Sequence, residues 1–241
     1  MVLEHRIRAI HLRPAADLAA RVLLPGDPHR ALALAQELLD PPKMSNHSRG
    51  LWGYTGIAAD GEPLTIQSTG MGGPSAAIVC EELIALGANR LIRVGTCGAL
   101  VRGFKLGELL AAETVLPADG ASRALGAGAR LRPDPALVDR LVAAGARPAT
   151  VATSDLFFDP RETVARDWAQ RGAVAVEMEA AAVFQVAARR GVAAACVLGV
   201  TDVPGDNGSR RATSEQIEAI GLRAGEAGFA ALAAPREARS L

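Results

Sequence analysis

Two glutamates stand close together in one of the most apolar stretches of the chain. In the segment "AVEMEAAA", Glu177 and Glu179 are separated only by Met178. A buried carboxylate costs free energy unless a partner pairs with it, so both side chains are expected to have partners. Acids near a helix N-terminus complement the helix dipole, which is one explanation of the pattern. A functional site is the other.

A second segment, "LLPGDPHRA", contains a glycine and an arginine that could serve an anion. We expect a strand that stops at Pro25, a tight turn at Gly26 and a helix that Asp27 caps, with a proline at its first position. This is either an ordinary strand-turn-helix corner or an anion site. In the second case Gly26 lets a backbone N–H approach a phosphate, and Arg30 supplies charge one turn later. The P-loop signature GxxxxGK[ST] does not occur here.

Another glycine-rich turn, "STGMGGPSAA", opens a predicted helix. Gly70, Gly72 and Gly73 allow close backbone approach. The dinucleotide fingerprint GxGxxG is incomplete, because Ser75 stands where its last glycine would be. Met71, taken alone, is more typical of core packing than of a ligand contact.

An arginine interrupts the apolar strand "RLIRVGTCGA". If that strand is central, Arg93 is costly unless it meets an anion. Thr96 lies at the end of the strand, where its hydroxyl could donate to the same anion. Cys97 is interpreted from its type as a small buried hydrophobe.

Two further strand ends carry candidate residues. Phe157 and Phe158, in "VATSDLFF", are core residues or a flat apolar partner for a base. Thr201 and Asp202 end the segment "GVTDVPGD". Asp202 is a turn or cap residue, or an acid whose pKa is raised from about 3.9 by partial burial.

Composition excludes several classes of protein. The 241-residue chain has no net charge and 49% apolar residues, which argues against a nucleic-acid-binding surface. No apolar run approaches the length of a membrane span. The segment "MVLEHRIRAIHLRP" is interrupted by charges and contains no signal-peptide core. We therefore expect a cytoplasmic protein that binds neither nucleic acid nor membrane. With three cysteines and no CxxC pair, a disulfide framework or a zinc site is not expected.

These residues are far apart in the sequence and need a fold that brings them together, and the pattern of segments indicates which fold. Short apolar runs alternate with helical patterns, for example residues 21–28 with 29–40, 64–74 with 75–88 and 173–180 with 181–191. This alternation favours an α/β fold with a largely parallel sheet. Residues 119–133 are expected to form a flexible loop. Because ligands bind beyond the carboxyl ends of strands in α/β sheets, the polar strand ends should form the site.

Taken together, the motifs resemble the family of purine nucleoside phosphorylases and uridine phosphorylases, in its hexameric class. The resemblance runs in family order from about His11 to Asp202. It rests on "LLPGDPHR", "SRGLWGYTG", "TGMGGPSAAIVCEEL", "IRVGTCGA", "SDLFF", "VEMEAAAVF" and "TD". It implies a single domain over residues 1–241, with a central mixed, largely parallel sheet flanked by helices. It also implies an enzyme, a pentosyltransferase.

The resemblance assigns roles to individual residues. Those assigned to inorganic phosphate are Gly26, Arg30, Arg49, Arg93 and Thr96. Those assigned to the ribose are His11, Met71, Glu177, Met178 and Glu179. Those placed at the base are Phe157, Cys97, Thr201 and Val176. Asp202 would protonate the leaving purine.

Arg49 and His11 would serve the neighbouring subunit's site in a homohexamer built as a trimer of dimers. His5 fits the family spacing less well than His11. The reaction implied is phosphorolysis, with a nucleoside and inorganic phosphate as substrates. It needs no metal and no cofactor.

Departures from the family pattern leave the base open. Purine members usually carry an arginine after the aspartate, for which Arg210 and Arg211 are candidates at a shorter spacing. The segment "ADGASR" is similar to uridine phosphorylases, but their glutamine-and-arginine insertion is missing and Asp202 is present. A purine nucleoside phosphorylase is therefore favoured. Alternatives are a uridine or methylthioadenosine phosphorylase and, less favoured, a nucleosidase or a non-catalytic nucleoside-binding protein. Nucleosidases lack the PGDPxR corner.

The segment "VEMEA" also sets a geometric condition. In a strand, Glu177 and Glu179 point to one side and Met178 to the other. The resemblance has all three lining the sugar. The backbone is therefore expected to leave strand geometry here, where strand turns to helix.

Overall fold

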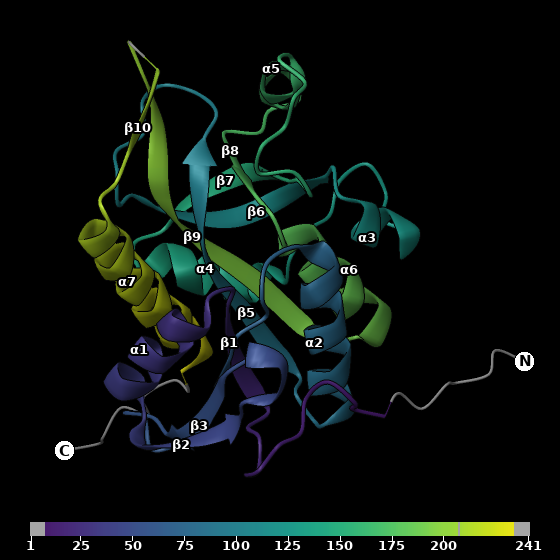
Figure 1. The fold of residues 1–241 in the computed structure, drawn as a ribbon, viewed down its shortest axis with the longest axis vertical. Coiled ribbons are helices and arrows are strands. Elements are labelled where there is room, and N and C mark those ends of the chain that lie inside the picture. Colours follow the sequence, from purple (N-terminus) through teal and green to yellow (C-terminus); the bar gives the residue numbers. More distant parts are fainter. Residues whose placement is uncertain (1–7, 207, 234–241) are drawn as a thin grey trace, which may run out of the picture.

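The computed structural model describes residues 8–206 and 208–233, and its elements are labelled in Figure 1. The strands are β1 (Arg21–Pro25), β2 (Asp40–Asn46), β3 (Gly53–Ile57), β4 (Pro63–Gln67), β5 (Arg90–Ala99), β6 (Leu109–Pro117), β7 (Arg147–Thr153), β8 (Ala175–Glu177), β9 (Ala193–Gly205) and β10 (Gly208–Arg211). The helices are α1 (Pro28–Leu38), α2 (Gly73–Ala85), α3 (Gly120–Ala124), α4 (Pro135–Ala143), α5 (Val164–Gln170), α6 (Ala180–Arg190) and α7 (Ser214–Leu232), with a 3₁₀ turn at Ser48–Gly50.

The ten strands of the described residues belong to one sheet, in the order β10-β9-β6-β7-β8-β5-β1-β4-β3-β2. An additional pairing of β9 with β5 closes β9, β6, β7, β8 and β5 into a ring. This ring places β5 and β9 side by side in the middle of the molecule (Figure 1).

The expectation of a mixed sheet flanked by helices is confirmed, but its largely parallel character is wrong. Five pairings are parallel and five are antiparallel. A parallel pair needs a crossover of about a dozen or more residues. Only a loop over residues 100–108 joins β5 to β6, so β6 returns in the opposite direction to β5 and β9 and pairs antiparallel with β9.

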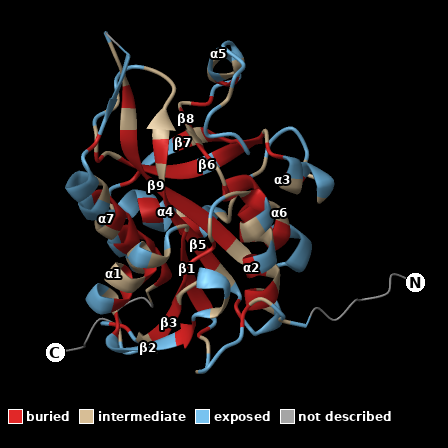
Figure 2. Cartoon of the chain, in the orientation of Figure 1, coloured by how far each residue is buried: buried red, intermediate tan, exposed pale blue. Residues whose placement is uncertain are grey.

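Helices cover both faces of the sheet. Strand residues alternate between two apolar clusters: Val22 and Leu24 belong to one, and Leu23 to the other. The first cluster includes the inner faces of α2 and α6, and the second those of α1, α4 and α7. Figure 2 shows the resulting buried centre, with exposed residues on the outer sides of the helices. No helix in residues 8–206 and 208–233 is long and apolar enough to cross a membrane.

Local signals set the element ends near the strand carboxyl termini. Asp27 caps α1 by accepting from the N–H of His29, and Pro28 occupies its first turn, as the sequence predicts. The predicted loop over residues 119–133 instead begins with α3. Asp119 caps that helix, because its carboxylate accepts from the N–H of Ser122.

Candidate active site

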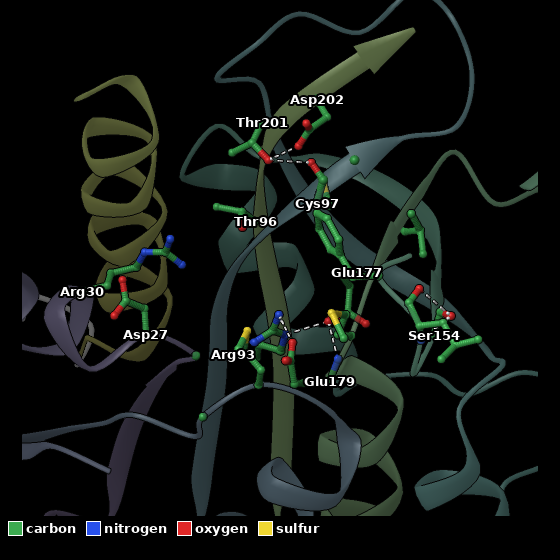
Figure 3. A pocket seen from close by; sticks show the side chains of 18 of the residues that line it. Asp27, Arg30, Arg93, Thr96, Cys97, Ser154, Glu177, Glu179, Thr201 and Asp202 are labelled. Carbon is green, nitrogen blue, oxygen red and sulfur yellow. Dashed lines mark hydrogen bonds and ion pairs between the residues drawn. The ribbon is translucent and has the colours of Figure 1, made fainter. Parts of the chain in front are cut away.

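A cavity of about 670 Å³ opens at the carboxyl ends of β1, β5 and β9. This size falls within the range of about 300–1,000 Å³ that small-molecule sites occupy. The residues that line it are Gly26, Asp27, Pro28, Arg30, Gly70, Met71, Arg93, Thr96, Cys97, Gly98, Ser154, Leu156, Phe157, Val176, Glu177, Met178, Glu179, Thr201, Asp202 and Arg211. The sequence-predicted site residues are all among them except His11 and Arg49. Figure 3 shows their side chains from close by.

Arg93, in β5, is the buried partner of both glutamates. Its Nε lies 2.8 Å from Glu177 Oε2, and its Nη2 pairs with Glu179. Burial alone would lower the pKa of Arg93, but Glu179 and Glu177 outweigh burial and raise it above the ordinary value. The third nitrogen, Nη1, is buried and has no hydrogen-bond partner. Because an unpaired buried donor is costly, Nη1 marks a place where an anion fits.

Glu177 is engaged entirely by the chain's own donors. Its carboxylate accepts from Arg93, from the hydroxyl of Thr153 and from the N–H groups of Glu179 and Ala180. It therefore caps the first turn of α6, where a negative charge complements the helix dipole. For Glu177 the structure shows the helix-terminus interaction, and the same residue also lines the cavity.

Glu179 stands where strand becomes helix. β8 ends at Glu177 and α6 begins at Ala180, and Glu179 itself has φ −138° and ψ −21°. The expected departure from strand geometry is confirmed. One carboxylate oxygen accepts from the N–H of Gly72 at 2.6 Å. Burial raises the pKa of Glu179, Arg93 opposes this, and Glu177 adds to the rise.

Arg30 supplies a second guanidinium to the same end of the cavity. Its guanidinium makes no hydrogen bond and no ion pair with the described residues. Burial lowers its pKa, Arg93 lowers it further, and the carboxylates of Asp27 and Glu179 oppose the fall. Next to it, a Cβ at Gly26 would lie 3.4 Å from the carbonyl oxygen of Gly70 and 3.9 Å from Arg93 Nη1. Two guanidiniums and a bare backbone corner form an anion-binding geometry.

The other end of the cavity is built around Asp202. One of its carboxylate oxygens accepts from the hydroxyl of Thr201 at 2.8 Å, and the other pairs with Arg211 Nη1 at 3.0 Å. The guanidinium of Arg211 also lies over the ring of Phe157, 5.9 Å from its centroid. The antiparallel β9–β10 pairing sets Arg211 opposite Asp202. Of the two candidate arginines, the structure brings Arg211 into the cavity and not Arg210.

Sequence reasoning missed Ser154 and Leu156. Ser154 follows β7 and its N–H donates to the carbonyl of Glu177 at 2.9 Å, which places it beside the cavity. The signal was present, because "VATSD" is a strand end with polar residues. In that segment, only the aromatic residues were singled out as candidates for the site, because of their residue type.

Two predicted residues lie outside the cavity of their own chain. His11 Nδ1 is 2.6 Å from Glu82 Oε1, and the carboxylate of Glu82 also accepts from the N–H groups of His11 and Leu12. Arg49 is exposed and has φ 60°, a left-handed conformation that is uncommon for residues other than glycine and is concentrated at functional sites. His5 lies outside the described residues.

Metal-ligating clusters are not part of the described site. Within residues 8–206 and 208–233, no group of three or more His, Cys, Asp or Glu side chains could hold a metal ion.

Comparison with known families gives a match over most of the chain. Residues 20–234 match the family model described as the phosphorylase superfamily. The chain is 36% identical over 195 residues to a DeoD-type purine nucleoside phosphorylase from Caldanaerobacter subterraneus subsp. tengcongensis, covering 77% of this chain and 84% of that protein. It is 37% identical over 196 residues to a DeoD-type purine nucleoside phosphorylase from Oceanobacillus iheyensis, with coverages of 77% and 83%.

A solved structure extends the comparison to the fold. The crystal structure of uridine phosphorylase from Vibrio fischeri ES114, in complex with 6-hydroxy-1-naphthoic acid, superposes with a TM-score of 0.78. Sequence identity is 27%, and the match covers 89% of this chain and 90% of that one.

Proposed function

Because this chain belongs to the phosphorylase superfamily, we propose that it is a purine nucleoside phosphorylase. It would catalyse the reversible phosphorolysis of purine ribonucleosides or deoxyribonucleosides to the free base and the sugar 1-phosphate. The observation that carries the proposal is that one cavity holds an anion corner and a carboxylic acid at opposite ends. Arg30 and the unpaired Nη1 of Arg93 form the first, and Asp202 forms the second.

The anion corner fits inorganic phosphate. Guanidiniums bind phosphate oxygens through charge-assisted hydrogen bonds, and Gly26 lets the backbone approach closely. A phosphate held there attacks C1′ of the sugar, and a new C1′–O bond forms as the C1′–N bond to the base breaks. The departing base takes the electron pair of the broken bond. Phosphate is then a co-substrate, and neither a metal nor a cofactor takes part.

The two glutamates suit the sugar in between. Breaking a glycosidic bond develops positive charge on the sugar in an oxocarbenium-like transition state. Glu179 places a carboxylate beside that charge and can accept hydrogen bonds from ribose hydroxyls. Glu177 would contribute indirectly, because it holds Arg93 and the N-terminus of α6 in place.

Asp202 would act as the acid. Protonation of the purine at N7 makes it a better leaving group, and general acids of this kind contribute about 10²–10⁴ in rate. Asp202 would give up that proton, and the nearby guanidinium of Arg211 would stabilise the carboxylate that remains. Phe157 lies on the same side as a flat apolar neighbour for the base.

A uridine phosphorylase is the second candidate, favoured by the fold of the Vibrio fischeri structure. A pyrimidine has no N7 to protonate, so Asp202 would have no comparable role. Among the described residues, the cavity lining contains no glutamine that could read uracil. These points favour a purine. The 5′ substituent of the sugar is left open, so methylthioadenosine belongs among the test substrates.

A panel of nucleosides tests the proposal. Base release from inosine, adenosine, methylthioadenosine and uridine is measured with and without inorganic phosphate. We expect phosphate-dependent release from a purine nucleoside. Equal rates without phosphate would identify a nucleosidase, and faster turnover of uridine than of every purine would identify a uridine phosphorylase. Saturable nucleoside binding without products would identify a non-catalytic binding protein.

Assembly and location complete the proposal. A homohexamer made of three dimers would let Arg49 and His11 reach the neighbouring subunit's cavity. The positive φ of the exposed Arg49 and the position of both residues outside their own cavity support this arrangement. A cytoplasmic location is part of the same proposal.

A further inference from the structure

Helix α7 contains three glycines, Gly221, Gly225 and Gly228, and all three are buried. Glycine is among the least favourable residues for a helix interior. Three of them in one helix therefore call for a packing reason. Such a reason exists when a neighbouring side chain occupies the place that a Cβ would fill.

The neighbour at Gly221 is Arg30. A Cβ at Gly221 would lie 2.5 Å from Arg30 Nε and 3.0 Å from its Cδ. At Gly225 the corresponding neighbour is Leu34, whose Cδ2 would be 2.0 Å away. The two neighbours are one turn apart on α1, so α1 packs against the glycine side of α7 and Arg30 crosses α7 on its way to the cavity. Figure 3 shows Arg30 beside this helix.

The rotation of α7 about its own axis is fixed independently. Ile220 is buried and lies against Gly199 of β9, where a Cβ would be 2.1 Å from Ile220 Cγ2. The start of the helix is set by a capping box between Thr213 and Gln216. With Ile220 held against the sheet, Gly221 faces α1 and cannot turn away from Arg30.

Packing is what orients the Arg30 side chain. No hydrogen bond or ion pair within residues 8–206 and 208–233 holds its guanidinium. By contrast, Glu177 and Glu179 hold Arg93 directly. A group that narrows the path across α7 therefore displaces the Arg30 side chain without breaking a hydrogen bond or an ion pair of the described residues.

We propose that Gly221 is a positioning residue for the anion corner. Because it has no side chain, it leaves the space across α7 through which the Arg30 side chain reaches the cavity. The identification of the anion as phosphate rests on the proposed function. Gly221 itself would touch neither phosphate nor nucleoside, and it would act only through Arg30.

The test is the affinity for inorganic phosphate, measured by titration calorimetry on the full chain. Gly221→Ala displaces Arg30, and we expect phosphate binding to weaken about tenfold, as for the loss of a hydrogen bond between charged groups. The matched control is Gly228→Ala, the same substitution in the same helix. A Cβ there meets Leu23 at 3.1 Å, in the core and not at the cavity, so phosphate affinity should stay within about twofold. Thermal unfolding checks that both variants fold.

A double-mutant cycle separates positioning from a general effect on the fold. Arg30→Ala weakens phosphate binding, and adding Gly221→Ala should weaken it no further, because the group that Gly221 positions is gone. Full additivity, or unchanged phosphate affinity in a folded Gly221→Ala variant, would overturn the positioning role. A wild-type protein that binds no phosphate would instead overturn the proposed function and, with it, the inference.

Discussion

Arg93 organises the cavity at the scale of single residues. Its side chain pairs with Glu177 and Glu179. Glu177 ends β8, the strand that pairs with β5, and Glu179 follows it just before α6. A Cβ at Gly95 would lie 2.7 Å from Arg93 Nη2, so glycine two residues along the strand leaves room for the guanidinium. The single guanidinium thus pairs with both carboxylates, and of its three nitrogens Nη1 has no hydrogen-bond partner among the described residues and is left for a ligand.

Two adjacent arginines allow a sharp test of the acid. Arg211→Ala should lower the turnover of a purine nucleoside, because the carboxylate of Asp202 loses its neighbouring positive charge. The loss should not exceed that of Asp202→Ala, about 10²–10⁴. Arg210→Ala is the matched control, because successive strand residues point to opposite faces and Arg210 does not line the cavity. Steady-state kinetics at saturating phosphate measure all three. Equal losses for the two arginines would contradict the assignment.

The raised pKa of Glu179 predicts a pH dependence. If the ionised form of Glu179 supports catalysis, kcat/KM has its full value above this pKa and decreases as the pH falls through it. Because burial raises the pKa of Glu179, the decline should begin above the ordinary glutamate value of about 4.3. Glu179→Gln should lower kcat/KM at neutral pH by about 10²–10³, as for other groups that stabilise transition-state charge.

Glu179→Gln is also the control for the shape of the profile. Every other group is the same in both proteins, so the part of the acid limb that disappears in the variant belongs to Glu179. Profiles are measured at a constant concentration of phosphate dianion. An identical acid limb in the variant would remove Glu179 from the explanation.

At the scale of elements, junctions place the functional groups. The β1–α1 corner carries Gly26 and Arg30, the β8–α6 junction carries Glu179, and the β9–β10 hairpin brings Arg211 back to Asp202. A further contact between distant segments lies away from the cavity. Glu82 of α2 accepts hydrogen bonds from the N–H groups of His11 and Leu12 and contacts the ring of His11.

Glu82 should therefore stabilise the fold. Burial acts to raise its pKa, but the hydrogen bonds from Leu12 and His11 outweigh burial and lower it. Its contribution is present above the ordinary glutamate pKa and is lost as pH falls through the lowered value. Glu82→Gln should reduce the free energy of unfolding at pH 7 by at least about 1.5 kcal/mol. Urea unfolding at pH 7 and at acidic pH measures this, and the difference from wild type should shrink at acidic pH.

Its neighbour on the same helix is the control. Glu81 pairs with Arg190 at the partly exposed surface, where an ion pair contributes only about 0–1 kcal/mol. Glu81→Gln should thus destabilise the protein less than Glu82→Gln. The reverse order would show that the buried carboxylate does not anchor this segment.

At the scale of the whole molecule, two large apolar side chains that line the cavity, Met71 and Phe157, are exposed. His11 and Arg49 lie outside it in their own chain. The proposed assembly gives both observations one explanation, because a neighbouring subunit would complete each cavity with these residues.

Mixing two weakened variants tests the shared site. Arg49→Ala and Asp202→Ala should each be weakly active alone. In a mixed dimer, the subunit with Asp202 intact receives an intact Arg49 from its neighbour, so one of the two sites is restored. Random reassociation should recover about a quarter of wild-type activity for an isologous pair. Recovery no greater than the sum of the two variants would show that Arg49 serves its own subunit or none.

Much of the site followed from residue types and their order along the chain. The β1–α1 corner depends on Asp27 and Pro28, which act within one turn. Polar residues at strand ends signalled the cavity, because parallel strands bring their carboxyl ends to one edge. The strand-to-helix change after Glu177 followed from alternation within a strand.

Only the tertiary structure decided which distant groups meet. Arg93 and Glu177 are 84 residues apart, and their pairing depends on how β5 and β8 align. The choice of Arg211 over Arg210 depends on the register of a hairpin that the sequence did not reveal. The balance of parallel and antiparallel strands depends on which strands become neighbours in the closed ring. Local sequence specifies residue types and turns, whereas register and packing are set by contacts across the whole chain, so the sequence supplied the site's components and the fold supplied their partners.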